Sequence, residues 1–284
     1  MIIVKMADGL GGQMSRYALG RYLAIKNQTD LFFDISFYQS KHNFSECDTR
    51  SFGLNQFNIK AQIANERQIR RLKTNRYLKR LGFIKSTHII KDFDAFEINN
   101  FKLKDDCYIE SGIASLRTWS EIRPLLLQEF SLKEEFKLDD KLTDLILSNT
   151  VALHCRRGDK ANNPKVNQVH GVCSIEYYQQ SIKYLQEHLS DFNLLIFSDE
   201  PDWVEVNLRF SQPVKFVADL HLTDNQELIL MSRCHHQITA NSGFSWWAAW
   251  LNDSPEKIVI TPQKQCNDLS LSARSAIPES WVRI

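Results

Sequence analysis

The sequence contains no closely spaced pair of cysteines. Its six cysteines are scattered, and even the nearest two, Cys155 and Cys173, lie too far apart for the C-x-x-C spacing of zinc and redox sites. Scattered cysteines in a chain of 284 residues are typical of free thiols in a reducing compartment. We therefore expect free cysteines and a cytoplasmic protein.

Long apolar runs and a strong charge imbalance are also missing. No stretch approaches the roughly 18 consecutive apolar residues of a membrane-spanning helix, and Met1 runs directly into a strand-like segment without the layout of a signal peptide. The formal net charge of +1 gives no reason to expect binding to nucleic acid. The hydrophobic content of 43% is that of an ordinary globular protein, and the length allows two modest domains.

Strand-like and helix-like segments alternate at both ends of the chain. Residues 2–6 form an apolar strand, residues 7–13 a glycine-rich turn, and a helix and a second strand at 31–33 complete a βαβ start. Further strands are predicted at 151–154, 194–197, 214–217, 237–240 and 258–260, and helices at 176–189, 225–234 and 244–251. We predict two α/β halves, residues 1–149 and 150–284, each with a parallel sheet.

The middle of the chain is harder to assign. An amphipathic helix is predicted over residues 134–147, next to the boundary between the halves. The stretch from Arg67 to Lys85 is rich in Lys and Arg and contains no acidic residue. It is interpreted as a solvated helix face. The alternative is peripheral contact with anionic lipid headgroups at the inner face of the plasma membrane, which would suit a lipid-linked substrate.

Polar side chains follow three of the predicted strands in the C-terminal half. The strand at 151–154 runs into H-C-R-R-G-D (residues 154–159), Ser198-Asp199 follows the next strand, and residues 241–245 follow the strand at 237–240. In an open parallel sheet such ends meet at one crevice, where these folds bind ligands. Arginine guanidinium groups, small hydroxyl side chains and the N–H groups at a helix N-terminus all bind phosphate oxygens. Their combination at this edge predicts a diphosphate site. The alternative is an arginine pair that serves structural ion pairs only.

Four segments in matching order resemble the bacterial α-1,2-fucosyltransferases of glycosyltransferase family eleven. They are Gly9-Leu10-Gly11 with Gln13-Met14, the H-C-R-R-G-D run, Phe197-Ser198-Asp199, and Asn241 to Trp247. The resemblance spans nearly the whole chain and is most specific over residues 230–252. It implies a GT-B-like fold, with two Rossmann-like halves facing a central cleft. The N-terminal half would hold the acceptor and the C-terminal half the nucleotide sugar.

The activity implied by this resemblance is an inverting transfer of L-fucose from GDP-β-L-fucose to the 2-hydroxyl of a β-galactoside. The implied partners are GDP-fucose and a galactose-terminated glycan of a bacterial O-antigen or other surface polysaccharide, and no metal or other cofactor is required. Two alternatives stay open. One is a fucosyltransferase of different regiochemistry or acceptor, and the other is an inactive homologue that only binds glycan or nucleotide sugar.

The resemblance also implies roles for individual residues. Arg156 would neutralise the β-phosphate of departing GDP, where a preorganised arginine stabilises the developing negative charge. His154, Arg157 and Asp159 would hold or orient that group, and Glu227 would read guanine N1 and N2. Eight further residues are expected to bind the donor: Gly9, Gly11, Gln13, Ser198, Asp199, Asn241, Ser242 and Ser245.

The N-terminal half departs from the family's pattern. Gly12 stands where the family usually has Asn, Ser15 where it has an aromatic residue, and Ile113-Ala114-Ser115 where it has Tyr-Trp-Gln. These departures bear on the identity of the acceptor more than on that of the donor. Inversion needs a group to take the proton of the acceptor hydroxyl, and Asp8 and Glu110 are two open candidates. For each, the alternative is an ordinary loop carboxylate.

Three short patterns are interpreted as incidental. Gly9-Leu10-Gly11 with Asp34 resembles a dinucleotide fingerprint, but the position of the third glycine is Met14. Asp92-Phe93-Asp94 matches the D-x-D metal pattern of other glycosyltransferases, but it follows no clear sheet edge. Cys234-His235-His236 lacks a second pair of ligands at zinc spacing.

Overall fold

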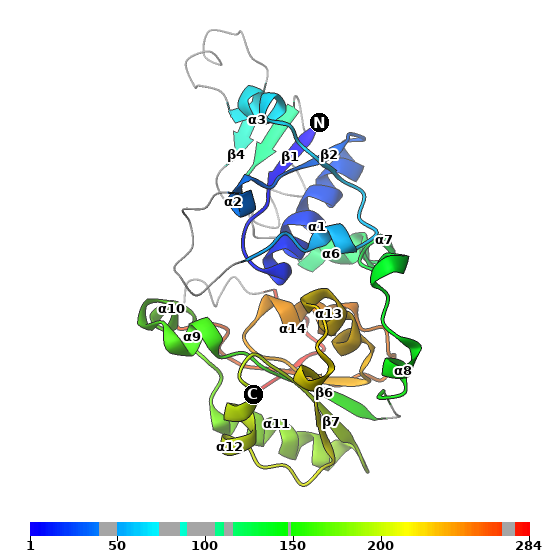
Figure 1. Cartoon of the computed structure of the whole chain (residues 1–284), viewed down its shortest axis with the longest axis vertical. Coiled ribbons are helices and arrows are strands. Elements are labelled where there is room, and N and C mark those ends of the chain that lie inside the picture. Colours follow the sequence, from blue (N-terminus) through cyan, green and yellow to red (C-terminus); the bar gives the residue numbers. More distant parts are fainter. Residues whose placement is uncertain (40–49, 74–85, 90–105, 111–115, 147–148, 269–275) are drawn as a thin grey trace. The chain divides into compact units, whose positions relative to one another are not determined.

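The chain folds into two α/β units, Met1–Ser131 and Leu132–Ile284, each built on its own parallel sheet (Figure 1). The computed structural model describes residues 1–39, 50–73, 86–89, 106–110, 116–146, 149–268 and 276–284. The predicted α/β class with two parallel sheets is confirmed. The division lies earlier than expected, so that residues 132–149 belong to the second unit.

The first unit is a five-stranded sheet with helices between its strands. Its elements are β1 (Ile2–Lys5), α1 (Leu10–Lys26), β2 (Leu31–Asp34), α2 (Ser36–Gln39), η1 (Leu54–Gln56), β3 (Gln62–Ile63), α3 (Glu66–Lys73), β4 (Ser86–Ile89), β5 (Asp106–Ile109), α6 (Leu116–Glu121) and α7 (Arg123–Glu129). The strand order is β3-β2-β1-β5-β4, with parallel pairing throughout. The order reverses between β1 and β5, so the loops that follow these two strands flank a topological switch point.

Both faces of this sheet are covered. On one face α1 approaches closely because Gly20 has no side chain; a Cβ there would lie 2.7 Å from Val4 Cγ2. On the other face Leu72 of α3 packs with Ile3 and Tyr108. The side chains of Ile3 and Val4 lie on opposite faces of the sheet, because successive side chains of a strand point to alternate faces. The uninterrupted apolar run of β1 is explained by this double coverage.

Helix α3 is fastened to the first unit by its own cations. Lys73 Nζ lies 3.1 Å from Oδ2 of the buried Asp34, and Arg71 pairs with Asp106. In the described part of the basic stretch, Arg67, Arg70 and Arg71 are exposed, as the prediction of a solvated helix face requires. Residues 74–85 lie outside the described residues, and the lipid alternative stays a hypothesis. Within the part of the chain that the structure describes, every helix is too short or too polar to span a bilayer.

The second unit is a six-stranded sheet. Its elements are η2 (Glu134–Phe136), α8 (Asp140–Thr143), β6 (Thr150–Cys155), α9 (Gly158–Asn162), α10 (Pro164–His170), α11 (Ile175–His188), β7 (Asn193–Ser198), α12 (Pro201–Asn207), β8 (Val214–Phe216), η3 (Val217–Leu220), α13 (Asp224–Arg233), β9 (His236–Ile238), α14 (Gly243–Leu251), β10 (Val259–Thr261) and β11 (Val282–Arg283). The strand order is β11-β10-β9-β6-β7-β8, all parallel. This is the doubly wound order of dinucleotide-binding folds, with its switch point between β6 and β9.

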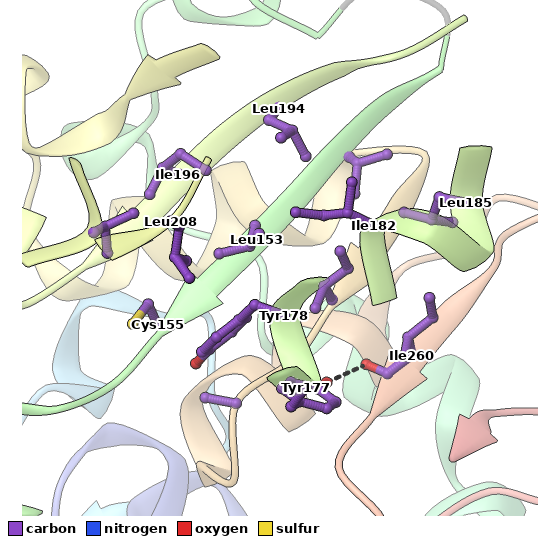
Figure 2. Close-up of a cluster of buried hydrophobic side chains, with 14 of the residues drawn as sticks. Leu153, Cys155, Tyr177, Tyr178, Ile182, Leu185, Leu194, Ile196, Leu208 and Ile260 are labelled. Atoms are coloured by element: carbon purple, nitrogen blue, oxygen red, sulfur yellow. Dashed lines mark hydrogen bonds between the residues drawn. The ribbon is translucent and has the colours of Figure 1, made fainter. Parts of the chain in front are cut away.

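The sheet of the second unit is also covered on both faces. Helices α11 and α12 lie on one side, and α13 and α14 on the other (Figure 1). Figure 2 shows the core beneath α11, where Ile182 and Leu185 meet Leu153 and Ile196 of the strands. On the opposite face α14 buries Trp247 completely. Both layers hold the carboxyl ends of β6, β7 and β9 in fixed positions.

The prediction of one helix over residues 134–147 is wrong. The described part of this segment forms only η2 and α8, with Lys137 in an extended conformation between them. The Asp139 carboxylate accepts a hydrogen bond from Lys141 N at 2.9 Å and so caps α8. Aspartate favours such a cap over a helix interior, and it therefore interrupts an otherwise helical pattern.

The prediction of free cysteines is confirmed for the five that the structure describes. Cys107, Cys155, Cys173, Cys234 and Cys266 are all buried and unbridged. Burial raises the pKa of the Cys155 thiol to about 11, so this thiol stays protonated at the end of β6. It behaves as a small apolar side chain beneath the polar loop that follows.

Candidate active site

Three polar strand ends meet at the carboxyl edge of the second sheet. Strand β6 lies between β7 and β9, so the loops that carry Arg156, Asp199 and Asn241 are neighbours. Arg156 Nη1 lies 3.0 Å from Asp199 Oδ2. Lys160 of α9 donates to Asn241 Oδ1 over 3.1 Å. The structure thus brings together the three segments that the sequence predicted to converge.

The guanidinium of Arg156 is held between two carboxylates. Its Nη2 lies 2.6 Å from Asp159 Oδ1, and its Nη1 contacts Asp199 from the neighbouring strand end. Gly158 makes this contact possible, because a Cβ at that position would collide with the Asp199 carboxylate. The Arg156 side chain remains 34% exposed. The site therefore offers an oriented, charged hydrogen-bond donor that an anion can reach.

Arg157 has different surroundings. Its Nε lies 3.0 Å from Glu200 Oε2, and its guanidinium carbon lies 3.7 Å from the ring centroid of Trp203. Its backbone N–H donates to Asp199 Oδ1 over 2.9 Å. Cation–π stacking and the ion pair hold this side chain against α12. Both arginines thus take part in ion pairs, as the structural alternative expects, but Arg156 joins two strand ends whereas Arg157 lies against α12.

His154 is buried with part of its hydrogen-bonding capacity unused. The ring is 6% exposed and lies 5.6 Å from the ring of Phe244. No described residue hydrogen-bonds to its buried Nδ1. Burial, followed by the charges of Arg156 and Lys160, lowers the pKa of His154 to about 3, so the imidazole is neutral near pH 7. An unpartnered buried nitrogen costs about 1–3 kcal/mol, which favours a ligand group at this point.

The loop from β9 to α14 is shaped by its own side chains. Ser242 Oγ accepts from Phe244 N at 3.3 Å and caps α14, and the buried Ser245 Oγ accepts from Ala240 N at 3.2 Å. Ser198 plays a similar part after β7, where its Oγ accepts from Glu200 N. The N-terminus of α14 thereby faces the edge of the sheet with its positive dipole end, which suits an anion.

Glu227 lies in the first turn of α13, after β8. This turn is at the carboxyl edge of the sheet because α13 follows a parallel strand, and α13 packs against α14. Burial and then Asp224 raise the pKa of Glu227 to about 7. No described residue donates a hydrogen bond to its half-buried carboxylate. Perturbed carboxylates without donors are typical of ligand-binding positions.

The two candidate bases, Asp8 and Glu110, lie at the switch point of the first sheet. Arg16 connects them, with Nη2 3.0 Å from Asp8 Oδ2 and Nη1 donating to the Glu110 backbone oxygen over 2.9 Å. Lys5 Nζ lies 3.5 Å from Glu110 Oε2. Each carboxylate thus has a neighbouring cation, and the geometry leaves both candidates open.

The first loop is held by a buried glutamine and depends on the lack of a side chain at position 12. The buried Gln13 donates to Ser51 O over 2.8 Å and accepts from Gly53 N at 2.9 Å. Asp8 has φ +69°, and a Cβ on Gly12 would lie 2.6 Å from Asp8 Cβ. The asparagine that the family usually has at position 12 is therefore incompatible with this placement of Asp8. Around Gly9, no atom of the described residues lies within 4 Å of an added Cβ.

The residues that suggested a dinucleotide fingerprint have structural roles. Met14 is fully buried in α1. Asp34 is also fully buried, and its Oδ2 accepts from the Tyr108 hydroxyl at 2.6 Å and contacts Lys73 Nζ. These contacts occupy the carboxylate that would have to bind a ribose.

The patterns that suggested a metal have no counterpart in the described residues. His236 begins β9, and its Nδ1 accepts from Ile258 N at 3.0 Å. No group of three or more His, Cys, Asp or Glu in the described ranges could hold a metal ion. Residues 92–94 and 113–115 lie outside the described residues.

Three members of the cluster were missed in the sequence. Lys160 directly follows the H-C-R-R-G-D run, and Glu200 and Trp203 follow Asp199 within one helical turn. Their position after strand ends was a usable signal, because side chains there reach the same edge as the residues before them. Their partners, however, follow other strands, with Asn241 after β9 and Arg157 after β6.

Comparison with known proteins gives a consistent relationship. The family model described as glycosyl transferase family 11 matches residues 133–284. An Escherichia coli α-1,2-colitosyltransferase is 29% identical, with 100% of this chain and 99% of the relative covered. The E. coli O-antigen biosynthesis glycosyltransferase WbnK is 31% identical over 98% of this chain and 99% of its own. A solved structure of the α-1,6-fucosyltransferase NodZ, soaked with GDP-fucose, superimposes on this chain with a TM-score of 0.52. The sequence identity is 14%, and the superposition covers 95% of this chain and 95% of NodZ. NodZ is known from Bradyrhizobium. This likeness confirms the predicted GT-B-like fold.

Proposed function

Because the chain belongs to glycosyltransferase family 11, it is a glycosyltransferase, and we propose that it transfers L-fucose from GDP-β-L-fucose to the 2-hydroxyl of a β-galactoside. The observation that carries this proposal is the convergence of Arg156, His154 and the α14 N-terminus at the switch point of the second sheet. Arginine, a neutral imidazole and helix N–H groups form a site for a leaving diphosphate.

The proposed reaction follows from charge development. The bond between fucose C1 and the β-phosphate oxygen breaks, GDP keeps the electron pair, and the acceptor oxygen bonds to C1 from the opposite face with inversion. Arg156 stabilises the negative charge on GDP, and a site already oriented by Asp159 and Asp199 needs little reorganisation. Glu227 accepts hydrogen bonds from guanine N1 and N2. The acceptor proton passes to Asp8 or Glu110.

The names of the relatives support the linkage and the setting. One transfers colitose with α-1,2 linkage, and the other acts in O-antigen biosynthesis. We therefore propose that the product is part of a bacterial surface polysaccharide. The proposed acceptor is a galactose-terminated glycan, either free or lipid-linked, and the reaction requires no metal. The colitosyltransferase also favours a second candidate, in which the donor sugar is colitose, which is fucose without its 3-hydroxyl.

A transfer assay tests these proposals. The purified protein is incubated with GDP-fucose or GDP-colitose and a panel of β-galactosides, with and without EDTA, and the product linkage is assigned by NMR. We expect an α-1,2-linked fucoside that forms equally well in EDTA. A product from GDP-colitose alone would replace the donor assignment. GDP binding without any transfer would indicate the inactive homologue.

Substitution of Arg156 tests the site itself. Arg156→Ala is expected to lower kcat by about a hundredfold or more, because it removes the donor that faces the leaving group. The fold should be retained, since the side chain is partly exposed. Arg233→Ala, which removes an exposed arginine at the end of α13, is the matched control. An Arg156→Ala enzyme with full activity would contradict the assignment.

A further inference from the structure

Lys160 is held in place at the switch point, between the ends of β6 and β9. Its Nζ donates to the backbone oxygen and to Oδ1 of Asn241. Asn241 Nδ2 in turn donates to His170 O over 3.0 Å and to Gly171 O over 3.1 Å. An ammonium group has three N–H donors, so one remains beyond the two that Asn241 accepts. Among the described residues only Asn241 accepts from Nζ, so the half-buried side chain is a fixed cation with one donor to spare.

The charge balance of the cluster distinguishes Lys160 from the two arginines. Arg156 lies beside Asp159 and Asp199, and Arg157 beside Glu200. Among the residues that the structure describes, no carboxylate is within ion-pair distance of Lys160 Nζ. Burial, together with the neighbouring charge of Arg156, lowers the pKa of Lys160. An arriving anion could compensate this charge without breaking an existing ion pair.

We propose that Lys160 is a further cationic contact of the donor's diphosphate, beside Arg156. The inference rests on the proposed function, since it takes the ligand to be a nucleoside diphosphate sugar. A diphosphate carries more charge than Arg156 offers, because two carboxylates already share that guanidinium. His154 gives an independent sign of a ligand: no described residue hydrogen-bonds to its buried Nδ1, and the ring lies close enough to Arg156 and Lys160 for their charges to lower its pKa.

Binding of GDP and of guanosine to the full chain tests this contact. We expect Lys160→Met to weaken GDP binding about tenfold or more, the loss typical of a charge-assisted hydrogen bond. Guanosine, which has no phosphate, should bind as it does to the unchanged protein. Lys160→Arg should keep most of the GDP affinity because it keeps the charge. Lys165→Met removes an exposed lysine from α10 and controls for a general loss of positive charge.

The outcomes separate the contact from the proposed function. Unchanged GDP affinity in Lys160→Met overturns the contact. An equal loss for GDP and guanosine also overturns it, because Lys160 would then act only through the shape of the Asn241 loop. If Lys160→Met does not fold, Lys160→Gln keeps the hydrogen bonding without the charge and gives the same distinction. If the unchanged protein binds no GDP, the proposed function falls and the contact with it.

Discussion

At the scale of single residues, adjacent side chains of the same chemistry have different tasks. Arg156 points to the edge of the sheet between Asp159 and Asp199, whereas Arg157 stacks on Trp203. The sequence predicts that two arginines follow the strand, but the difference between them depends on partners from β7 and α12. Both residues lie in the loop between β6 and α9, and Arg157 caps α9, so their side chains leave the strand end towards different elements.

Glu227 should affect stability and ligand binding in opposite directions. Its pKa of about 7 lies above the ordinary value of 4.5. Below pH 4.5 both the folded and the unfolded chain hold the proton. Between pH 4.5 and about 7 only the folded chain keeps it, so stability falls over this range and the full loss is reached above pH 7. Glu227→Gln is therefore expected to stabilise the ligand-free protein at pH 8, by about 2 kcal/mol after allowance for partial exposure. Chemical denaturation measures this gain.

The same substitution should weaken GDP binding. Guanine N1–H and N2–H need the carboxylate, so GDP affinity in the unchanged protein should fall about tenfold between pH 8 and pH 6. Glu227→Gln should bind GDP weakly with little dependence on pH, as isothermal titration would show. Glu205→Gln, at an exposed site on α12, serves as the control for both measurements. A variant that is stabilised but binds GDP normally would remove Glu227 from the guanine site.

At the scale of secondary-structure elements, Asp34 fixes three elements of the first unit at the end of β2. Burial raises its pKa, but hydrogen bonds from Tyr108, Ser36 and Lys73 outweigh that effect and lower it to about 2. Its stabilisation is therefore present above about pH 4 and lost as the pH falls towards 2. Asp34→Asn should cost about 2 kcal/mol at pH 7 and progressively less in acid. Urea denaturation of this variant, with the exposed Asp30→Asn as control, measures the difference; a constant difference at all pH values would contradict it.

The elements that could be predicted are those whose own residues dictate them. Apolar runs predict β6, β7 and β9, and the helical period predicts α11, α13 and α14, each within a few residues of its observed bounds. Strand β3 has two exposed residues and exists only through pairing with β2, so no pattern indicates it. The helix expected over residues 134–147 is interrupted by the local cap of Asp139, which outweighs the periodic pattern.

At the scale of the whole molecule, the two units differ in how they match the family. The family model covers residues 133–284, which is almost the whole of the second unit, Leu132–Ile284. The strand-end cluster around Arg156 lies in this unit, and so does Glu227. The departures at Gly12 and Ser15 lie in the first unit, where Asp8 occupies the space that a larger residue at position 12 would need. Donor chemistry is thus expected to be shared with the family, and acceptor choice to be particular to this chain.

This division predicts where ligands protect the backbone. GDP should slow amide hydrogen exchange at residues 156–160 and 241–245, because a bound diphosphate stabilises the strand ends against local opening. Residues 180–188 of α11 should exchange as before, since this helix covers the face of the sheet that lies away from α13 and α14. Arg156→Ala should lose the first effect at the same GDP concentration. Protection confined to the first unit would place the nucleotide elsewhere, because ligand binding protects most strongly the segments that it contacts.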